Sequence, residues 1–352
     1  MGRIYLDHAA TSPLRPEAKA AMEEGFAIWA NPSSPHAEGR KARAALEDAR
    51  ARCKAALGWD GELIFTSGAS EALWIALNRA KVGQERIRRR IVSAVEHDAV
   101  FRAAPDAEVV DVPLYKAQVD LEQLEASLAR QGRAVVAVQR LNSETGTALE
   151  MVDTCAAIRA AHGLFLADCS QSAGKASLPD CDMAVISAHK LGGPVGIGAL
   201  LVRDFAMLEP AGGHERGYRQ GTENMPAALG FAAALEASGL HSWKTSDMER
   251  YAFRDKLWGY GKGLILGPQS EWLISVAHPT MSAQAALIRL DAMGFAVSAG
   301  SACSSGSLKK SRVLDAFGVD DDTAARTIRV SLGWNTTPAD LDAFAEAWAS
   351  LS

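Results

Sequence analysis

The stretch Asp182 to Gly196, DMAVISAHKLGGPVG, contains an apolar run that ends directly in a histidine, a lysine and two glycines. The run MAVIS has the length and the apolar content of a buried strand. A lysine at the end of such a strand lowers stability unless the structure uses its amine. His189 and Lys190 are therefore candidates for a functional site.

On both sides of this stretch, runs typical of strands alternate with helical patterns. Strand, helix, strand at this spacing predicts crossover connections, and hence a largely parallel sheet covered by helices on both faces. From about Gly217 the pattern changes to longer helices with few strands, which predicts a second, smaller α+β part. The expected strands of the two parts are ELIFTS (62–67), RIVSAV (90–95), AVVAVQRL (134–141), LFLAD (164–168), DMAVIS (182–187), GALLVR (198–203), WLISVA (272–277), FAVSA (295–299) and TIRVSL (327–332).

Length and composition exclude several classes of protein. The chain has 352 residues, 48% of them apolar, and a formal net charge of -5. Acidic and basic residues are interspersed, and no run approaches the ~20 apolar residues of a membrane span. The first residues lack the charged and apolar regions of a secretory signal. We therefore expect a cytoplasmic protein that binds neither nucleic acid nor a membrane.

Five cysteines are spread along the chain without a C-x-x-C pair, which favours neither a disulfide framework nor a metal site. Cys53, Cys155, Cys169 and Cys181 lie in apolar or helical surroundings and are expected to be buried. Cys303 lies in SAGSACSSGS, a run of small and polar residues, so its thiol is expected to be accessible.

Polar side chains follow four of the expected strands, and ligands bind beyond the carboxyl ends of strands in open parallel sheets. The turn TSGASEA (66–72) opens a helix and offers backbone N–H groups to an anion, although a purely local turn explains it equally well. Asp168 follows LFLA and by itself is explained as a helix cap. Asn142 follows AVVAVQRL, and Lys190 follows DMAVIS.

Taken together, these strand ends match the needs of one cofactor. An anion cradle, a buried carboxylate and a lysine at one sheet edge are what pyridoxal 5'-phosphate requires as phosphate anchor, ring-nitrogen partner and Schiff-base amine. Lys190 and Asp168 are the expected amine and carboxylate, and the glycines after Lys190 let the main chain pass close to the cofactor.

The chain also resembles a known family, the cysteine desulfurases of the NifS and IscS kind, within the class-V aminotransferases. The resemblance runs in order from near the N-terminus to about Gly333. The motifs that carry it are YLDHAATSP, NPSSPHAEGR, FTSGASEA, EHDAV, LNSETG, ADCSQSAGK, SAHKLGGPVGIGALLVR, GHERGYRQGTEN, SAGSACSSGS and IRVSLG.

The resemblance implies a fold-type I pyridoxal-phosphate enzyme. Its large domain, with a mainly parallel sheet covered by helices, is expected over residues 16–216, and its small α+β domain over 1–15 and 217–352. Lys190 is expected to form the Schiff base, Asp168 to pair with the ring nitrogen and Gln171 with the 3-oxygen. His97 matches the histidine that stacks on the ring and is expected to take part in proton transfer.

The remaining implied contacts concern the phosphate and the substrate. Thr222 matches a threonine that reaches the phosphate across a subunit interface, so a homodimer is implied. Asn142, also expected at the cofactor, and Arg329 match the pair near the substrate carboxylate, where a guanidinium suits bidentate binding. The other expected phosphate ligands are Ala69, Ser70, Ser187 and His189.

Cys303 matches the family nucleophile, which attacks the sulfur of L-cysteine and holds it as a persulfide for an acceptor protein. Iron–sulfur cluster assembly and thiolation are the expected uses of this sulfur. A selenocysteine lyase shares every motif and differs in its dependence on Cys303. An aminotransferase of the same fold needs no thiol, and a cofactor-free relay module needs neither Lys190 nor Asp168.

Overall fold

The computed structural model describes residues 2–114, 116–299 and 311–351. Its larger part is built around a seven-stranded sheet with the order β2-β10-β9-β8-β7-β5-β6. Strand β10 runs antiparallel to both neighbours, and the other strand pairs are parallel. The strands are β2 (Glu62–Thr66), β5 (Arg89–Ser93), β6 (Glu108–Val110), β7 (Ala134–Gln139), β8 (Leu164–Asp168), β9 (Met183–Ser187) and β10 (Gly198–Val202).

Helices cover both faces of this sheet, as the sequence predicts, because alternate residues of each strand enter two different apolar clusters. Ile64 packs with the helices of one face, whereas Leu63 and Phe65 pack with those of the other. The first face carries α3 (Ala69–Arg79) and α4 (Asp98–Ala103), and the second carries α1 (Pro16–Ala27), α2 (Ala37–Leu57), α5 (Leu121–Leu128), α6 (Val152–Ala160) and α7 (Met225–Glu236).

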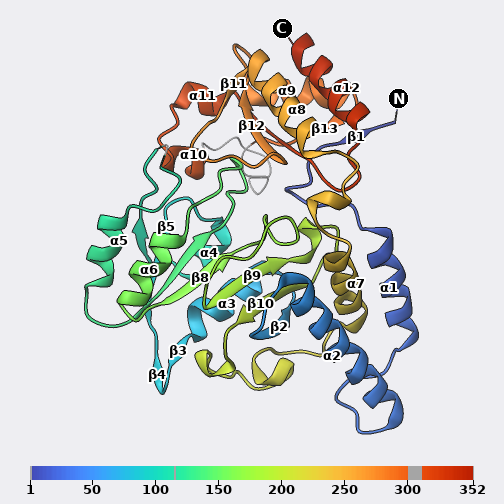
Figure 1. Ribbon diagram of the computed structural model, residues 1–352, viewed down its shortest axis with the longest axis vertical. Helices are drawn as coiled ribbons and strands as arrows, with labels where there is room; N and C mark the ends of the chain where they lie inside the picture. The colour runs from blue at the N-terminus through green and yellow to red at the C-terminus, as the bar shows by residue number, and fades with distance from the viewer. Residues whose placement is uncertain (1, 115, 300–310, 352) are drawn as a thin grey trace.

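The smaller part lies above the larger one in Figure 1 and contains a three-stranded antiparallel sheet. The N-terminal strand joins this part, since β1 pairs with β13 in parallel. Thr337 and Asp340 form a capping box at the start of the last helix. The elements are β1 (Ile4–Tyr5), α8 (Asp247–Tyr260), β11 (Lys262–Gly263), β12 (Leu273–Ala277), α9 (Ala283–Ala292), β13 (Phe295–Ala296), α10 (Arg312–Ala316), α11 (Asp321–Ala325), β14 (Thr327–Ser331) and α12 (Pro338–Ser350).

Helix α7 packs with the larger part, although the expected division of the chain at residue 217 assigns it to the smaller one. It packs on α1 and α2, and its buried residues belong to the apolar cluster of the larger part. The contact is close because a Cβ on Gly25 would meet the Cα of Pro226 at 2.6 Å, and one on Gly230 would meet Met22 at 2.6 Å. The expected boundary is therefore corrected for α7, and the rest of the division stays a prediction.

The predicted burial of four cysteines is confirmed, since Cys53, Cys155, Cys169 and Cys181 are buried free thiols. No helix in the described part of the chain has the length and apolar character needed to cross a bilayer.

Candidate active site

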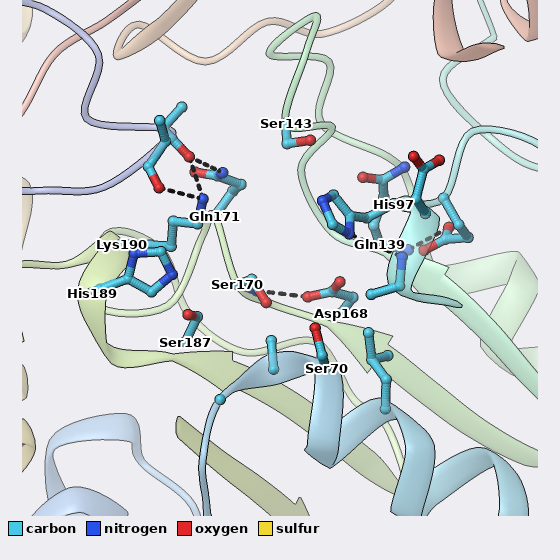
Figure 2. A pocket seen from close by; sticks show the side chains of 18 of the residues that line it. Ser70, His97, Gln139, Ser143, Asp168, Ser170, Gln171, Ser187, His189 and Lys190 are labelled. Carbon is cyan, nitrogen blue, oxygen red and sulfur yellow. Dashed lines mark hydrogen bonds between the residues drawn. The ribbon is translucent and has the colours of Figure 1, made fainter. Parts of the chain in front are cut away.

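One cavity of about 500 Å³ lies at the sheet edge where the carboxyl ends of β2, β5, β7, β8 and β9 meet (Figure 2). The fold brings together nine of the residues predicted from the sequence. The residues of this set that line the cavity are Ala69, Ser70, His97, Asp168, Gln171, Ser187, His189, Lys190 and Arg329.

The first turn of α3 forms one side of the cavity. Its N–H groups are among those that a helix leaves without an intrahelical acceptor, and the helix dipole favours an anion there. Gly68 precedes the helix at φ 154°, a backbone conformation open to glycine. Gly198 at the start of β10 allows the close approach, because a Cβ there would lie 2.9 Å from Gly68. Ser70 and Ser187 place hydroxyl groups beside this turn.

His189 lines the cavity next to Lys190, and its Nδ1 lies 3.1 Å from Oγ1 of Thr11. Burial, and then the charge of Lys190, lower the pKa of His189 to about 4. The imidazole is therefore neutral near pH 7 and has one N–H to donate to an anion.

Lys190 ends a single 3-10 turn, Ala188–Lys190, directly after β9. Its Nζ donates hydrogen bonds to the carbonyl oxygens of Ala9 at 2.5 Å and Ala10 at 2.9 Å. Gly192 follows at φ +89°, and a Cβ there would meet the side chain of Arg15 at 2.6 Å. The glycine is thus needed so that the lysine turn can pack against the N-terminal segment.

Asp168 ends β8 and is buried, with its Oδ1 accepting a hydrogen bond from the Ser170 N–H at 2.9 Å. The amide of Gln171 donates to the carbonyl of Ala9 at 2.9 Å, which ties the β8 turn to the segment that binds Lys190. A carboxylate, an amide and an amine therefore face one cavity from the ends of two neighbouring strands (Figure 2).

His97 caps the N-terminus of α4, and its Nδ1 accepts a hydrogen bond from the Ala99 N–H at 3.1 Å. Burial is the largest influence on its pKa and lowers it, while Asp168 acts to raise it and Lys190 to lower it further. The ring is therefore neutral near pH 7, with Nδ1 as acceptor and the proton on Nε2.

Arg329 of β14 reaches the cavity from the smaller part. Its guanidinium donates to the carboxylate of Asp7 at 2.9 Å and to the carbonyl of Ser143 at 2.8 Å. The side chain is buried, and its Nε has no hydrogen-bond partner among the described residues. A guanidinium that lines a cavity suits a carboxylate ligand.

Two of the predicted residues in the described part of the chain do not line the cavity. Asn142 is buried, and its side chain binds the main chain of Val95, Glu144 and Thr145, so that Ser143 faces the cavity instead. Thr222 is exposed and lies outside the lining. Cys303 lies outside the described residues.

The cavity also contains residues that the sequence did not single out. Glu96 is fully buried, and its Oε1 accepts hydrogen bonds from Ser93 Oγ at 2.5 Å and the Gln139 N–H at 2.9 Å. Burial, with a smaller effect of Asp168, raises the pKa of Glu96 to about 8. The sequence feature that could have identified Glu96 as a site residue is its position next to His97 in EHDAV.

Arg312 is a second lining residue that was missed, and nothing in the sequence pattern marks it. Its guanidinium donates to the carbonyls of Ala94 and Glu96 and stacks over Phe101 at 4.1 Å.

Known proteins match this chain over almost its whole length. The family model described as aminotransferase class-V matches residues 4–344. A cysteine desulfurase of Trichormus azollae is 34% identical over 365 aligned positions, covering 97% of this chain and 91% of the relative. The solved structure of a NifS-like protein from Rickettsia africae has a TM-score of 0.85 at 28% identity, covering 98% of both chains. A structure of SspA in complex with cysteine has a TM-score of 0.80 at 27% identity, covering 95% of this chain and all of that one.

These matches confirm the predicted fold-type I architecture and the resemblance to NifS and IscS proteins. The chain belongs to the class-V aminotransferase family, whose members use pyridoxal 5'-phosphate.

Proposed function

We propose that this protein is a pyridoxal-phosphate-dependent L-cysteine desulfurase. It converts L-cysteine to L-alanine and transfers the sulfur to Cys303 as a persulfide. The observation that carries the proposal is the convergence of Lys190, Asp168 and the first turn of α3 on one cavity. The names of the relatives, which include cysteine desulfurases, support the choice of substrate.

The residues of the cavity fit the cofactor. The N–H groups and hydroxyls of Ala69, Ser70 and Ser187, with His189, suit a phosphate group. Asp168 suits a protonated ring nitrogen, and Gln171 a ring oxygen. When bound through Lys190, pyridoxal 5'-phosphate supplies an electron sink for a substrate carbanion.

The chain's own residues then have distinct roles in the reaction. Arg329 binds the substrate carboxylate, with Ser143 lining that end of the cavity. The Nζ of Lys190 takes the proton from the substrate Cα, and neutral His97 assists proton transfer. The thiolate of Cys303 attacks the substrate sulfur, so that an S–S bond forms and the Cβ–Sγ bond breaks. The electron pair of the broken bond stays with the substrate, which takes up a proton at Cβ and recovers one at Cα from Lys190 before it is released as alanine.

The assembly and the destination of the sulfur are part of the same proposal. The exposed position of Thr222 agrees with a role in the phosphate site of a second subunit in a homodimer. The persulfide is passed to an acceptor protein in the cytoplasm, for iron–sulfur cluster assembly or thiolation. Relatives named IscS support this use.

The test uses L-cysteine labelled with heavy sulfur and compares the wild type with Cys303→Ser. The variant should bind cofactor normally but release almost no alanine, because a hydroxyl is a far poorer nucleophile towards sulfur. In the wild type, the peptide that contains Cys303 should gain the mass of one labelled sulfur.

Ser305→Ala, in the same run of small residues, is the matched control and should behave as the wild type. Equal alanine from Cys303→Ser and the wild type would overturn the mechanism. Activity of Cys303→Ser on selenocysteine alone would instead indicate a selenocysteine lyase.

A further inference from the structure

A second lysine, Lys175, lies behind the turn that carries Lys190. Its Nζ donates hydrogen bonds to the carbonyl oxygen of Lys190 at 3.2 Å and to that of Gln171 at 3.0 Å. Gly174 directs the chain there with φ +72°, and a Cβ at this position would meet Oγ of Ser238 at 2.6 Å. The turn after β8 therefore contributes Asp168 and Gln171 to the cavity and Lys175 to the rear of the lysine turn.

The main chain of Lys190 is fixed by two donors of different kind. Besides Lys175, the hydroxyl of Ser12 donates to the Lys190 carbonyl at 3.3 Å. The N-terminal segment continues past this point, where Nε of Arg15 donates to the carbonyl of Leu191 at 3.1 Å. Ser12 thus donates to the Lys190 carbonyl from a neutral hydroxyl, whereas Lys175 donates to it from an amine that can carry a charge.

No carboxylate compensates this charge within the described residues. Both hydrogen-bond partners of Nζ are neutral carbonyls, and the ion-paired lysines of that part of the chain are Lys19, Lys256 and Lys262. Burial first, and then the charges of Lys190 and Arg15, lower the pKa of Lys175 to about 7. The repulsion between two cations acts on both of them, so Lys175 must also disfavour a proton on Lys190.

The other titratable groups near the two lysines supply little compensating charge from this side. Burial lowers the pKa of His8 to about 3 and that of His189 to about 4, so both are neutral near pH 7. His97 is neutral for the same reason, and Arg15 adds a further cation. The carboxylate of Asp168 lies in the cavity, in front of the lysine turn.

We propose that Lys175 is a positioning residue that holds the Lys190 main chain and, through its charge, makes the Nζ of Lys190 release its proton near neutral pH. This inference rests on the proposed function, in which Lys190 carries the cofactor and later removes the Cα proton. A free lysine amine has a pKa of roughly 10.4 and would be protonated at pH 7, when a base is required.

The experiment is a pH titration of the visible absorbance of the cofactor-loaded protein in the absence of cysteine. This band reports the protonation of the Lys190 nitrogen bound to the cofactor. Lys175→Met removes the charge and the hydrogen-bond donor, whereas Lys175→Gln removes the charge and keeps a donor. Both should raise the apparent pKa of the band by roughly 0.5 to 1 unit.

Ser12→Ala is the matched control, because it removes the neutral donor to the same carbonyl and should leave the apparent pKa unchanged. In Lys175→Arg the cation persists above pH 7, so the apparent pKa should fall below that of the wild type. The acid limb of the kcat profile should move in the same direction in each variant.

Titrations of Lys175→Met and Lys175→Gln that match the wild type within about 0.2 unit would overturn the inference. A shift in Lys175→Met alone would also overturn it, because the hydrogen bond and not the charge would then matter. If neither Lys175→Met nor Lys175→Gln folds, Lys175→Arg tests the proposal. An apparent pKa of the band equal to or above that of the wild type would then refute it. A wild-type chain that takes up no cofactor would refute the proposed function itself.

Discussion

The two sides of the cavity are built in different ways. The floor, formed by Asp168, Gln171 and Lys190, follows directly from β8 and β9 of one sheet and is hydrogen-bonded to main chain. The rim, formed by Arg312 and Arg329, comes from the smaller part and reaches across to the larger one. Floor positions depend on a single rigid sheet, whereas rim positions depend on how the two parts pack.

The two sides therefore suit different tasks. Groups on rigid strand ends keep their geometry without a ligand, so the floor suits covalent chemistry on the cofactor. The rim carries the guanidinium of Arg329, which lines the cavity and suits recognition of a substrate carboxylate. Substitutions on the two sides should therefore affect different measurements.

The floor should give the largest effect. Lys190→Ala removes the covalent attachment and the base, so turnover of cysteine should fall by at least ~10³-fold. The visible band that borohydride abolishes in the wild type should be missing. Lys19→Ala, an exposed lysine on α1, is the control and should retain both. Alanine release at a rate near that of the wild type would show that the reaction does not require Lys190.

The rim should respond with cofactor binding intact. Arg329→Gln removes a charge-assisted contact, so KM for cysteine should rise roughly 10- to 100-fold while the absorbance spectrum stays that of the wild type. Steady-state kinetics and a cofactor titration measure the two quantities separately. Loss of the cofactor together with the rise in KM would remove the distinction between floor and rim.

Asp7 lies between the two sides and should have a smaller effect. It accepts a hydrogen bond from Arg329 and belongs to the N-terminal segment that also contacts Lys190. Asp7→Asn keeps an acceptor but removes the charge, so KM should change only about 2- to 5-fold, with kcat nearly constant. A fall in kcat without a change in KM would place Asp7 with the floor instead.

Glu96, a buried carboxyl of the cavity, should affect the stability of the fold. The pKa of Glu96 is raised from 4.5 to about 8, so between these values the folded state retains a proton that the unfolded state has lost. The free energy of unfolding therefore falls as pH rises through this window. Glu96→Gln mimics the protonated acid and should be more stable than the wild type by roughly 1 to 3 kcal/mol at pH 8.

Urea unfolding at pH 5 and pH 8 tests this sign. The two proteins should have similar free energies of unfolding at pH 5. They should diverge at pH 8, where the carboxyl of Glu96 in the wild type is partly ionised. A variant that loses stability equally at both values would show that the carboxyl is held in its charged form.

Most of the floor could be predicted because strand ends are visible in the pattern of residues. LFLAD and DMAVIS place Asp168 and Lys190 at the same edge as soon as the strands are parallel neighbours. Asn142 shows the limit of this reasoning, since it follows a strand but turns inward to hold its own loop. The next residue, Ser143, faces the cavity instead of Asn142. The periodicity of the sequence does not indicate which of the two side chains faces the cavity.

Local periodicity and turn residues are sufficient to predict the parallel sheet, its covering helices and the chemical types at the strand ends. Other features depend on tertiary packing: Ala9 and Ala10 accept hydrogen bonds from Lys190, α7 joins the larger part, and Arg329 contacts Asp7. These contacts join segments far apart in the chain, and their geometry results from the packing of many side chains at once.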